Sequence, residues 1–382
     1  MIRAAVCGLG IGMAHCAGYR AGNGVELVAV ADLLPGRRGT VGGTFAAGSM
    51  LVLRPLYREE ELGLQWEDIG VTPRETLDEL LADPSIDLVS LCTPDYLHAQ
   101  HAIQVLEAGK HLLLEKPVAL TLADARRVQD AAAKAEAKGV MCTVGYEFRL
   151  NPAILKMRAL VQAGEVGHVE AFSLYHFRSP FRRDKWQHWI QKRALSGGLI
   201  VEETSHWLDL ARYITGKEVS SIHCVTTDRI HTDFDFEDVA YINGTYVDGA
   251  VFQISHALTG FDFDLTLIVH GTKGTVWCGL KETRSRAIDA GQTTYLGVVS
   301  WGNPGEGVAG ARTVTYGEEA TEPENIRDFA HHFAHCIAGQ RPPVVSVLDG
   351  VRALELAIAA GRSARLNRVI SMAEDTEEYG NT

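Results

Sequence analysis

Three short segments of the chain carry residues whose types and spacing could do chemistry. Gly8-Leu9-Gly10-Ile11-Gly12 is a glycine-rich turn of the kind that lets backbone amides approach a phosphate group. Glu115 and Lys116 place a carboxylate beside an ammonium group, which could donate to a substrate oxygen and stabilise an alkoxide. Glu202 and His206 are spaced i, i+4, so a helix would put both on one face. A histidine with an ordinary pKa of about 6.5 can accept a proton near neutrality, and the acid can orient it.

The elements that must position the first two segments alternate along residues 1–145. Short apolar runs typical of strands buried on both faces of a parallel sheet lie at Ala4–Cys7, Leu27–Ala31, Leu88–Cys92, Leu112–Leu114 and Val140–Val144. Helical patterns separate them, at Ala14–Ala21, Pro73–Ala82, Tyr96–Ala108 and Thr121–Ala137. This alternation predicts an α/β domain with a doubly wound parallel sheet, whose ligands bind at the carboxyl edge of the strands.

An acidic residue at the end of the second predicted strand supports dinucleotide binding. Asp32 follows Gly8 by 24 residues, where a carboxylate accepts hydrogen bonds from the adenine ribose hydroxyls. A carboxylate there repels a 2′-phosphate and favours NAD, but Arg37 is close enough to pair with such a phosphate, so NADP stays open. The turn departs from the G-x-G-x-x-G pattern, because Met13 stands where the third glycine belongs and Gly12 comes one place early.

The second half of the chain has a different pattern of predicted secondary structure. A helix is predicted over Ala153–Ala163, and strands without helical crossovers are predicted at Val169–Phe177, Ser221–Thr227, Val239–Asn243, Ala250–Ser255, Leu265–His270 and Thr275–Cys278. We therefore expect an α+β domain over residues 146–382 with an open, mostly antiparallel sheet. Two closing helices, Ile326–Ala338 and Val351–Ala364, are expected to pack back on the first domain. Residues 283–315 give no assignment, and residues 40–65 predict a surface insertion, either a lid or oligomer arm or a tolerated loop.

Composition limits the partners. The 382 residues carry a net charge of −12, which argues against nucleic acid, and no window approaches the ~18 consecutive apolar residues that a membrane span needs. The seven cysteines form no C-x-x-C pair, which predicts reduced thiols and a cytoplasmic location. No metal site is predicted. His331 and His335 are spaced i, i+4 but lack a third ligand, and the acidic residues at 233–238 are expected to form a solvated face.

The segment Gly109–Pro117 reads Gly-Lys-His-Leu-Leu-Leu-Glu-Lys-Pro and resembles the signature of the glucose–fructose oxidoreductase / inositol dehydrogenase (Gfo/Idh/MocA) family. Further similar blocks lie at Cys92–His98, Val144–Pro152, Ser196–Leu210, Phe263–Gly274 and Asp349–Leu354. The resemblance implies a Rossmann domain, an open-faced sheet domain and hydride transfer between NAD(P) and a secondary hydroxyl of a sugar, polyol or sugar derivative. It also implies a homodimer or homotetramer.

The resemblance further implies roles for individual residues. Catalysis would fall to Lys116, His206 and the acid four places before that histidine, which is Glu202 here where the family has Asp. Glu203 is adjacent, but on a regular helix it would point about 100° away, so Glu202 is preferred. The cofactor would be bound by Gly8, Gly10, Ile11, Gly12, Asp32, Arg37, Thr93, Pro94, His98, Glu115 and Lys116. The substrate would be bound by Lys116, Tyr146, Arg178, Trp186 and His206.

Two other functions are compatible with the same motifs. One is a non-catalytic NAD(P) sensor that regulates a protein partner, and the other is an NAD-assisted glycosidase or lyase. Retention of both Lys116 and His206 favours the dehydrogenase. The basic cluster Arg178–Lys185 would also let the acidic chain accept an anionic sugar.

Overall fold

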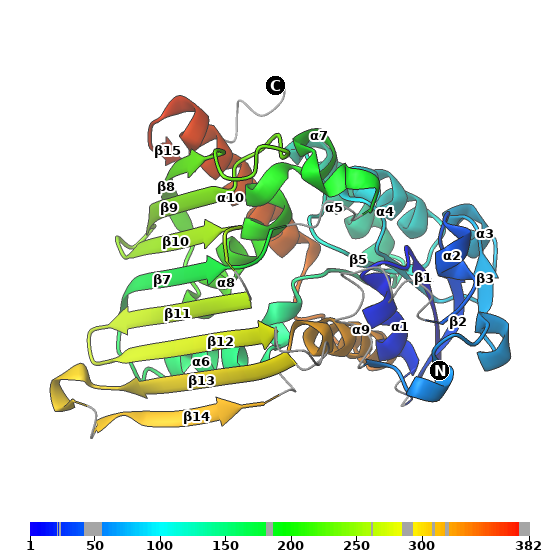
Figure 1. Ribbon diagram of the computed structural model, residues 1–382, viewed down its shortest axis with the longest axis horizontal. Helices are drawn as coiled ribbons and strands as arrows, with labels where there is room; N and C mark the ends of the chain where they lie inside the picture. Colours follow the sequence, from blue (N-terminus) through cyan, green and yellow to red (C-terminus); the bar gives the residue numbers. More distant parts are fainter. Residues whose placement is uncertain are drawn as a thin grey trace. The chain divides into compact units, whose positions relative to one another are not determined.

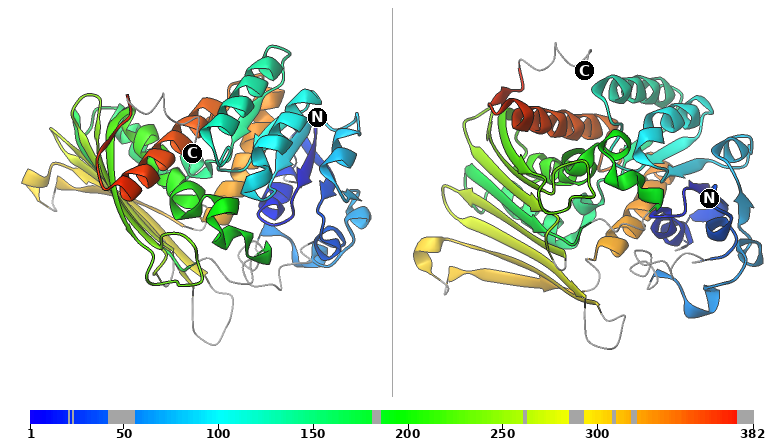
Figure 2. Two further views of the ribbon diagram at one scale, coloured as in Figure 1. Left: turned by 90° about the horizontal axis from the view of Figure 1, so that it is seen from above. Right: turned by 45° about the horizontal axis from the view of Figure 1, so that its top comes forward.

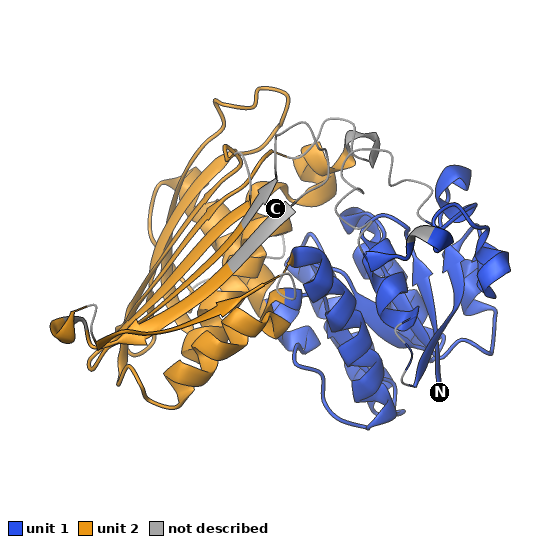
Figure 3. Cartoon of the chain, turned by 60° about the horizontal axis from the view of Figure 1, so that its bottom comes forward, with its two compact units in different colours: residues 1–147, 322–351 blue, residues 148–321, 352–382 orange. Residues whose placement is uncertain are grey.

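The computed structural model describes residues 1–20, 22, 24–41, 56–180, 186–260, 263–284, 293–307, 310–317 and 321–373. The chain divides into two compact units (Figure 3). The first unit comprises residues 1–147 and 322–351, and the second comprises residues 148–321 and 352–382. Each unit is built on its own β-sheet (Figure 1).

The first unit contains a parallel sheet. Its strands are β1 (Ile2–Cys7), β2 (Val25–Ala31), β3 (Thr72–Arg74), β4 (Leu88–Leu91), β5 (His111–Leu114) and β6 (Cys142–Val144). The order across the sheet is β3-β2-β1-β4-β5-β6, and every neighbouring pair is parallel. All residues of β4 are buried, as expected for a strand covered on both faces. This is the strand order of a doubly wound Rossmann sheet, so the predicted fold class is confirmed.

Helices connect these strands. They are α1 (Gly12–Arg20), α2 (Pro35–Arg38), α3 (Leu77–Leu81), α4 (His98–Glu107) and α5 (Leu122–Glu136), with the short 3-10 helices η2 (Glu59–Glu61), η3 (Trp66–Ile69) and η4 (Asp95–Leu97). Helix α9 (Glu322–Ala338) comes from much later in the chain and packs on α1. One contact between these two helices joins His331 Nδ1 to the carbonyl oxygen of Gly18 at 3.1 Å.

The predicted helix Pro73–Ala82 is wrong at its start. Thr72–Arg74 forms β3, which pairs with β2, and α3 begins only at Leu77. Proline lacks the N–H that a central strand would need, and β3 is accordingly an edge strand. The helix begins where Thr76 can cap it, since the Thr76 side chain accepts a hydrogen bond from the backbone N–H of Glu79.

The second unit contains a nine-stranded sheet. Its strands are β7 (Val169–Phe177), β8 (Val219–Thr227), β9 (Val239–Tyr246), β10 (Val251–Ala257), β11 (Phe263–Gly271), β12 (Thr275–Arg284), β13 (Thr293–Gly302), β14 (Arg312–Tyr316) and β15 (Ile370–Ser371). The order is β14-β13-β12-β11-β7-β10-β9-β8-β15, and every pair is antiparallel except β7 with β10. The predicted mostly antiparallel sheet is confirmed, and the described part of the unassigned segment 283–315 extends it.

The helices of the second unit lie on one face of this sheet (Figure 2). They are α6 (Pro152–Gln162), α7 (Arg193–Ser196), the π-helical segment η7 (Ile200–Thr204) and α8 (Ser205–Thr215), with the 3-10 turn η6 (Trp186–Gln191). The 3-10 turn η8 (Pro304–Glu306) lies in the connection between β13 and β14. Helix α6 packs on β12 and β13, and α8 packs on β7 and β10. Helix α10 (Val347–Leu366) contributes its first residues to the first unit and the rest to the second. The 3-10 turn η5 (Glu147–Leu150) contains the division between the two units.

The predicted surface insertion is described only at its two ends. Residues 42–55 lie outside the described residues, so its role as a lid or loop stays a prediction. Thr40 and Gln65 form an isolated antiparallel bridge, and Trp66 is fully buried, so both ends are anchored. Among the described residues, no helix combines the length and apolar character needed to cross a membrane.

Candidate active site

The glycine turn joins β1 to α1 and needs glycine for steric reasons. Gly8 has φ +94, and a Cβ there would lie 2.2 Å from the carbonyl oxygen of Cys92. A Cβ on Gly12 would lie 2.8 Å from Val6 Cγ1, so Gly12 allows the close helix–strand packing usually supplied by the third glycine of the fingerprint. Helix α1 begins at Gly12, and the N–H groups of Met13 and Ala14 donate to the carbonyl oxygens of Gly10 and Ile11 at 3.2 and 2.9 Å. The turn therefore leads directly into a helix N-terminus, whose positive dipole end favours an anion such as a pyrophosphate.

Asp32 lies at the end of β2 beside this turn. One carboxylate oxygen accepts from the Leu9 N–H at 2.8 Å, and the other accepts from the Leu34 N–H at 2.8 Å. Arg37 Nη1 lies 3.7 Å from the Asp32 carboxylate. Burial lowers the pKa of Arg37, and the charge of Asp32 opposes that effect. The predicted ribose-binding acid is thus held by main-chain donors, and Arg37 faces it.

His98 connects the loop after β4 with the loop after β5. It is fully buried, with Nδ1 2.7 Å from the carbonyl oxygen of Pro117 and Nε2 2.8 Å from that of Thr93. Burial lowers the pKa of His98, although both carbonyl groups favour its charged form. Pro94 precedes the 3-10 turn η4. The predicted cofactor residues Thr93, Pro94 and His98 therefore share one loop, and His98 braces it from within.

In the signature segment 109–117, the first residues hold neighbouring loops in place, whereas Glu115 and Lys116 lie at the predicted site. Lys110 donates to the carbonyl oxygens of Asp83 and Ile86 at 2.7 and 2.9 Å and so closes the loop before β4. His111 Nδ1 accepts from the backbone N–H of Met141 at 2.9 Å. Glu115 and Lys116 follow β5 at the carboxyl edge of the sheet, where open α/β sheets bind their ligands.

A buried chain of hydrogen bonds holds Glu115, and sequence reasoning did not find it. Glu115 Oε1 lies 2.9 Å from His15 Nε2, His15 Nδ1 lies 3.1 Å from Ser90 Oγ, and that hydroxyl lies 2.6 Å from Tyr19 Oη. The backbone N–H of Lys116 donates to Glu115 Oε2 at 3.2 Å. Burial alone would raise the pKa of Glu115, but the His15 hydrogen bond and the His15 and Lys116 charges lower it. The chain thus fixes the carboxylate next to Lys116.

Two further residues of this unit follow β6. Tyr146, predicted to bind substrate, is 1% exposed. Burial raises the pKa of Glu147 well above its ordinary value, and the nearby carboxylates of Glu115 and Glu322 raise it further. The acids of this region therefore favour different protonation states, with Glu115 ionised and Glu147 neutral.

In the second unit, the predicted base lies on α8 directly after the π-helical segment η7. Glu202 belongs to η7 and His206 to the first turn of α8, and both side chains are buried. The His206 ring packs against two aromatic side chains that also contact each other: its centroid lies 5.7 Å from those of Phe148 and Trp207, which are 5.3 Å apart. π-Helical turns are rare and are found frequently at functional sites. This packing fixes the orientation of the imidazole.

A buried ion pair anchors the same helix. Arg149 donates to Asp209 through Nε at 2.8 Å and Nη2 at 2.5 Å, a bidentate arrangement. The side chains of Arg149 and Asp209 are only 6% and 1% exposed. The guanidinium also lies over the Tyr213 ring, 4.6 Å from its centroid. Because both charges are buried, loss of either would leave the other uncompensated.

Arg178 and Trp186 were predicted to bind substrate. Arg178 Nη1 donates to Glu203 Oε1 at 2.7 Å, so its charge is neutralised within the protein. Trp186 begins the turn η6, but its side chain lies outside the described residues, as do residues 181–185 of the basic cluster. Glu203, which the prediction set aside, is 4% exposed and pairs with His176 as well.

The acidic segment at 233–238 is not simply a solvated face, so that prediction is wrong for two of its residues. Asp238 is fully buried and accepts from the backbone N–H groups of Ile230 and His231 at 2.7 and 2.8 Å. Glu237 is 6% exposed and pairs with Arg193. These carboxylates stabilise the loop before β9, a role that charge counting does not reveal.

The two units thus carry complementary chemistry. The first unit has a glycine turn, a held ribose-binding acid and a lysine at the same sheet edge, which together fit a dinucleotide. In the second unit, the buried imidazole of His206 follows the π-helical segment η7, which carries the buried carboxylate of Glu202. The groups of the first unit match the anionic and hydroxyl groups of NAD.

Comparison with known families agrees with this division. A sequence model described as an oxidoreductase family with an NAD-binding Rossmann fold (GFO_IDH_MocA) matches residues 2–146. A model of the GFO/IDH/MocA C-terminal domain matches residues 154–277. Together the two models match well over half of the chain.

Individual relatives extend the similarity along the whole chain. A scyllo-inositol 2-dehydrogenase (NAD(+)) of Bacillus subtilis is 27% identical over 371 residues, covering 95% of this chain and 94% of the relative. A myo-inositol 2-dehydrogenase of Thermotoga maritima is 26% identical over 323 residues, covering 83% of this chain and 89% of the relative. A levoglucosan dehydrogenase of Pseudarthrobacter phenanthrenivorans is 26% identical over 225 residues, covering 52% and 56%.

Solved structures share the fold. The crystal structure of an oxidoreductase domain protein from Kribbella flavida is similar with a TM-score of 0.76 at 20% identity, over 97% of this chain and 100% of that one. A probable dehydrogenase from Thermotoga maritima gives a TM-score of 0.73 at 24% identity, over 98% of this chain and 99% of that one. At these identities the likeness concerns the fold alone.

Proposed function

Because the chain belongs to the Gfo/Idh/MocA family of NAD-binding oxidoreductases, we propose that it oxidises a secondary hydroxyl of a cyclic polyol or sugar. Full-length relatives that are inositol dehydrogenases support this substrate class, with inositols as the first compounds to test. The same comparisons favour the dehydrogenase over a non-catalytic sensor or an NAD-assisted glycosidase or lyase. The observation that carries the proposal is the Glu115–Lys116 pair, placed at the carboxyl edge of a Rossmann sheet that also carries Asp32 and the glycine turn.

In this proposal His206 is the base that accepts the proton of the substrate hydroxyl. Lys116 donates a hydrogen bond to the same oxygen and stabilises the developing alkoxide. Glu202 orients the imidazole, and the aromatic rings of Phe148 and Trp207 limit its rotation. When bound, NAD supplies the acceptor for the hydride that leaves the carbon. Tyr146 and Arg178 are proposed as substrate contacts, with Arg178 already paired to Glu203.

NAD is the proposed physiological cofactor. The Asp32 carboxylate follows β2 beside the glycine turn, where Rossmann folds bind the adenine ribose, and a 2′-phosphate beside it would be repelled. Arg37 faces Asp32 rather than a free phosphate site, which further favours NAD. NADP remains the second cofactor to test, because Arg37 could turn toward a 2′-phosphate if the Asp32 charge were removed.

The direct test is turnover against a panel of inositols, free sugars, sugar acids and glycosides, each with NAD and NADP. We expect steady growth of reduced-nicotinamide absorbance with at least one cyclic polyol or sugar, faster with NAD. Tight NAD binding without turnover of any compound would contradict the proposal and favour a regulatory protein. Products of bond cleavage without net NADH would favour the glycosidase or lyase.

We also propose that the protein works as a homodimer or homotetramer. The subunits would be joined through the face of the second unit's sheet that is opposite to its helices. Cross-strand pairing places Tyr175, Tyr241 and Val225 in one row on that face, and they are 37%, 47% and 45% exposed. Val251 and Trp277 lie on the same face and are also exposed. An exposed apolar surface of this kind marks an association site.

Light scattering on Tyr241→Glu tests this interface. The wild type should be a dimer or tetramer, and the charged variant should shift toward monomer. Val247→Glu is a matched control, because Val247 is 74% exposed and follows the end of β9. A monomeric wild type, or dissociation by the control alone, would contradict the interface.

The proposed domains are residues 1–145 for the cofactor and 146–382 for substrate and assembly. The proposed location is the cytoplasm, since all seven cysteines are free thiols. Secretion with intact disulfide bonds between any of them would contradict that location.

A further inference from the structure

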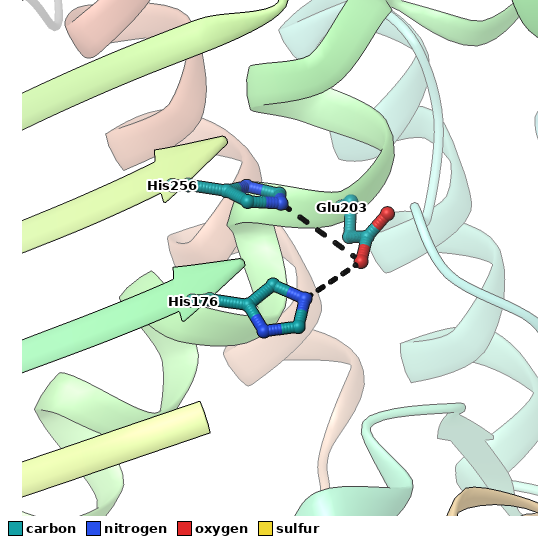
Figure 4. A group of neighbouring side chains, drawn as sticks. All are labelled: His176, Glu203 and His256. Carbon is teal, nitrogen blue, oxygen red and sulfur yellow. Dashed lines mark hydrogen bonds and ion pairs between the residues drawn. The ribbon is translucent and has the colours of Figure 1, made fainter. Parts of the chain in front are cut away.

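Three buried side chains of the second unit converge on one point beneath α8. His176 is on β7, His256 is on β10 and Glu203 is on η7; they are 0%, 0% and 4% exposed (Figure 4). His176 and His256 are directly paired across the parallel strands β7 and β10, so they present their rings side by side. One potential ligand atom from each of the three residues lies within 4.8 Å of the other two. We call these residues the His-His-Glu cluster.

Hydrogen bonds to the far side of each ring determine which nitrogen carries the proton. His176 Nδ1 lies 3.0 Å from the carbonyl oxygen of Asp264, which can only accept, so Nδ1 is the donor. His256 Nδ1 lies 2.8 Å from Thr204 Oγ1. The Thr204 hydroxyl gives its own proton to the Leu199 carbonyl at 3.1 Å, so it accepts from His256. In the neutral rings, both Nε2 atoms therefore present lone pairs.

These lone pairs face another acceptor. Glu203 Oε1 lies 3.3 Å from His176 Nε2 and 3.9 Å from His256 Nε2. His256 Nε2 and Glu203 Oε2 are buried and have no hydrogen-bond partner among the described residues. Three electron-pair donors enclosed together repel one another unless a cation lies between them. The Arg178 guanidinium compensates the Glu203 carboxylate through Oε1, but His256 Nε2 and Glu203 Oε2 still face no donor among the described residues.

We propose that the His-His-Glu cluster binds a first-row divalent cation, Zn²⁺ in the first instance, through both Nε2 atoms and the Glu203 carboxylate. Two imidazoles and one carboxylate form a known ligand set for zinc and other first-row metals. Zinc–nitrogen and zinc–oxygen bonds of about 2.0–2.1 Å put tetrahedral ligands roughly 3.3–3.4 Å apart. The His176–Glu203 separation of 3.3 Å matches this value, and the His256 Nε2 atom, at 3.9 Å from Glu203 Oε1, would have to move inward by about half an ångström. The Asp264 carbonyl and the Thr204 hydroxyl accept the Nδ1 protons, as the partners of metal-bound histidines usually do.

The charges around the cluster indicate what kind of fourth ligand the cation would need. Arg178 Nη1 already donates to Glu203 Oε1 at 2.7 Å, so the Glu203 and Arg178 charges cancel. A divalent cation would add two positive charges in a site walled by the Trp207 and Phe263 rings, whose centroids lie 4.5 and 4.7 Å from that of His176. An anion must compensate them, either hydroxide or an anionic ligand that enters from outside. The cation would link Glu203 on η7 to His176 and His256 on the sheet, and it would thereby also limit the movement of Glu202, which belongs to η7.

Metal content and cobalt titration test the proposal. The untagged full-length protein, dialysed after purification, should contain close to one equivalent of zinc by mass spectrometry. After chelation it should bind one Co²⁺ per chain and develop the visible d–d absorption of a four- or five-coordinate site. His256→Ala and His176→Ala should weaken Co²⁺ binding more than about 100-fold, beyond the loss typical when only a hydrogen-bond partner of a ligand is removed.

His335→Ala is the matched control, because His331 and His335 form another close imidazole pair, with their Nε2 atoms 3.0 Å apart. This variant should keep the cobalt spectrum and the stoichiometry. Absence of Co²⁺ binding at ~10 μM, or its loss in His335→Ala instead of His256→Ala, would overturn the proposal.

A second measurement keeps the proposal testable if the alanine variants fail to fold. Thr204→Val removes only the acceptor of His256 Nδ1 and should weaken Co²⁺ binding about 10- to 100-fold. Nitrogen NMR of the wild type should show neutral rings for His176 and His256 whose Nε2 signals shift when Zn²⁺ is added. An imidazolium at His176 that is unchanged by Zn²⁺ would show that a proton, not a metal, joins the cluster, and would refute the site.

Discussion

The two compact units hold their functional side chains by different means. In the first unit, main-chain groups hold two of the predicted cofactor residues: backbone N–H groups hold Asp32, and backbone carbonyls hold His98, whereas the His15 side chain holds Glu115. In the second unit, side chains hold one another: Arg149 pairs with Asp209, and Glu203 pairs with Arg178 and His176. A parallel sheet ends in loops whose backbone is available at one edge, whereas a helix lying on a sheet face has only its side chains to offer.

This difference predicts different weaknesses. A site built on backbone turns is sensitive to changes in local geometry and tolerant of most side-chain changes. A site built on buried charges is sensitive to the loss of any one charge, because the remaining partner is left in a low-dielectric interior. Lys116 belongs to the first unit and His206 to the second. The following substitutions compare the effect of changing each residue and of changing the groups that hold each unit's site.

Lys116→Ala should have the largest effect. If Lys116 is the proposed donor to the alkoxide, its loss should lower kcat about 10²- to 10⁴-fold, while NAD binding is retained. Steady-state kinetics with the best substrate and NAD titration by fluorescence measure the two quantities.

His206→Asn should give a loss of kcat in the same range and flatten the pH–rate profile on the acid side. Full activity in either variant would remove that residue from the mechanism.

Asp209→Ala should be the most damaging change to stability in the second unit. It leaves the Arg149 guanidinium buried without its carboxylate, which costs about 3–5 kcal/mol of unfolding free energy. Urea unfolding measures this value. Glu218→Ala is the matched control, because Glu218 pairs with Arg212 but its side chain is 62% exposed. That change should cost less than about 1 kcal/mol, and equal costs would show that burial does not govern the pair.

Gly8→Ala should break the backbone support of the first unit. The new Cβ would meet the Cys92 carbonyl oxygen, so the turn must move, and displacements of this size cost about 10²-fold in binding or rate. We expect NAD affinity to fall by that factor in calorimetry. Gly24→Ala has a similar positive φ of +96 but no atom within 4 Å of the new Cβ, so it should leave NAD affinity nearly unchanged. Equal losses would mean that strain, not the clash, is responsible.

Asp32→Asn should change cofactor preference with a smaller loss. It removes the charge that favours the ribose hydroxyls and weakens a hydrogen bond to a charged group, worth roughly 1.5–3 kcal/mol. The Kd for NAD should therefore rise about 10- to 100-fold, and NADP should gain relative to NAD because repulsion of its phosphate disappears. Competition binding with both cofactors measures the ratio. An unchanged NAD-to-NADP preference would contradict the assigned role.

Glu115→Gln should have the smallest effect, and one that depends on pH. The pKa of Glu115 is lowered in the folded state, so its contribution to stability is present above the unfolded pKa of about 4.3 and is lost as the pH falls through the folded pKa. The stability gap to wild type should be about 1 kcal/mol at pH 7 and should shrink below pH 4 in urea unfolding. Glu107→Gln, at an exposed position, should show no gap at either pH.

Much of the fold was predictable because its signals are local. The buried runs at Leu88–Cys92 and Leu112–Leu114 gave their strands to within a few residues, since apolar periodicity reflects burial directly. The strand at Thr72–Arg74 was missed because it is three residues long and contains Pro73. The site was predictable as residue types: Lys116 and His206 lie where the motif and the helix pattern indicated, each within its own unit.

The sequence by itself determined the alternation of elements, the glycine turn, the acid after β2 and the family motif, because each depends on neighbours within one turn or strand. Only the tertiary structure decided that His15 holds Glu115 and that Asp238 is buried. The same holds for the His-His-Glu cluster, whose members are far apart in the chain and meet because β7 pairs with β10 and η7 lies above them. Contacts between distant segments depend on strand order and helix placement, and no local spacing records them.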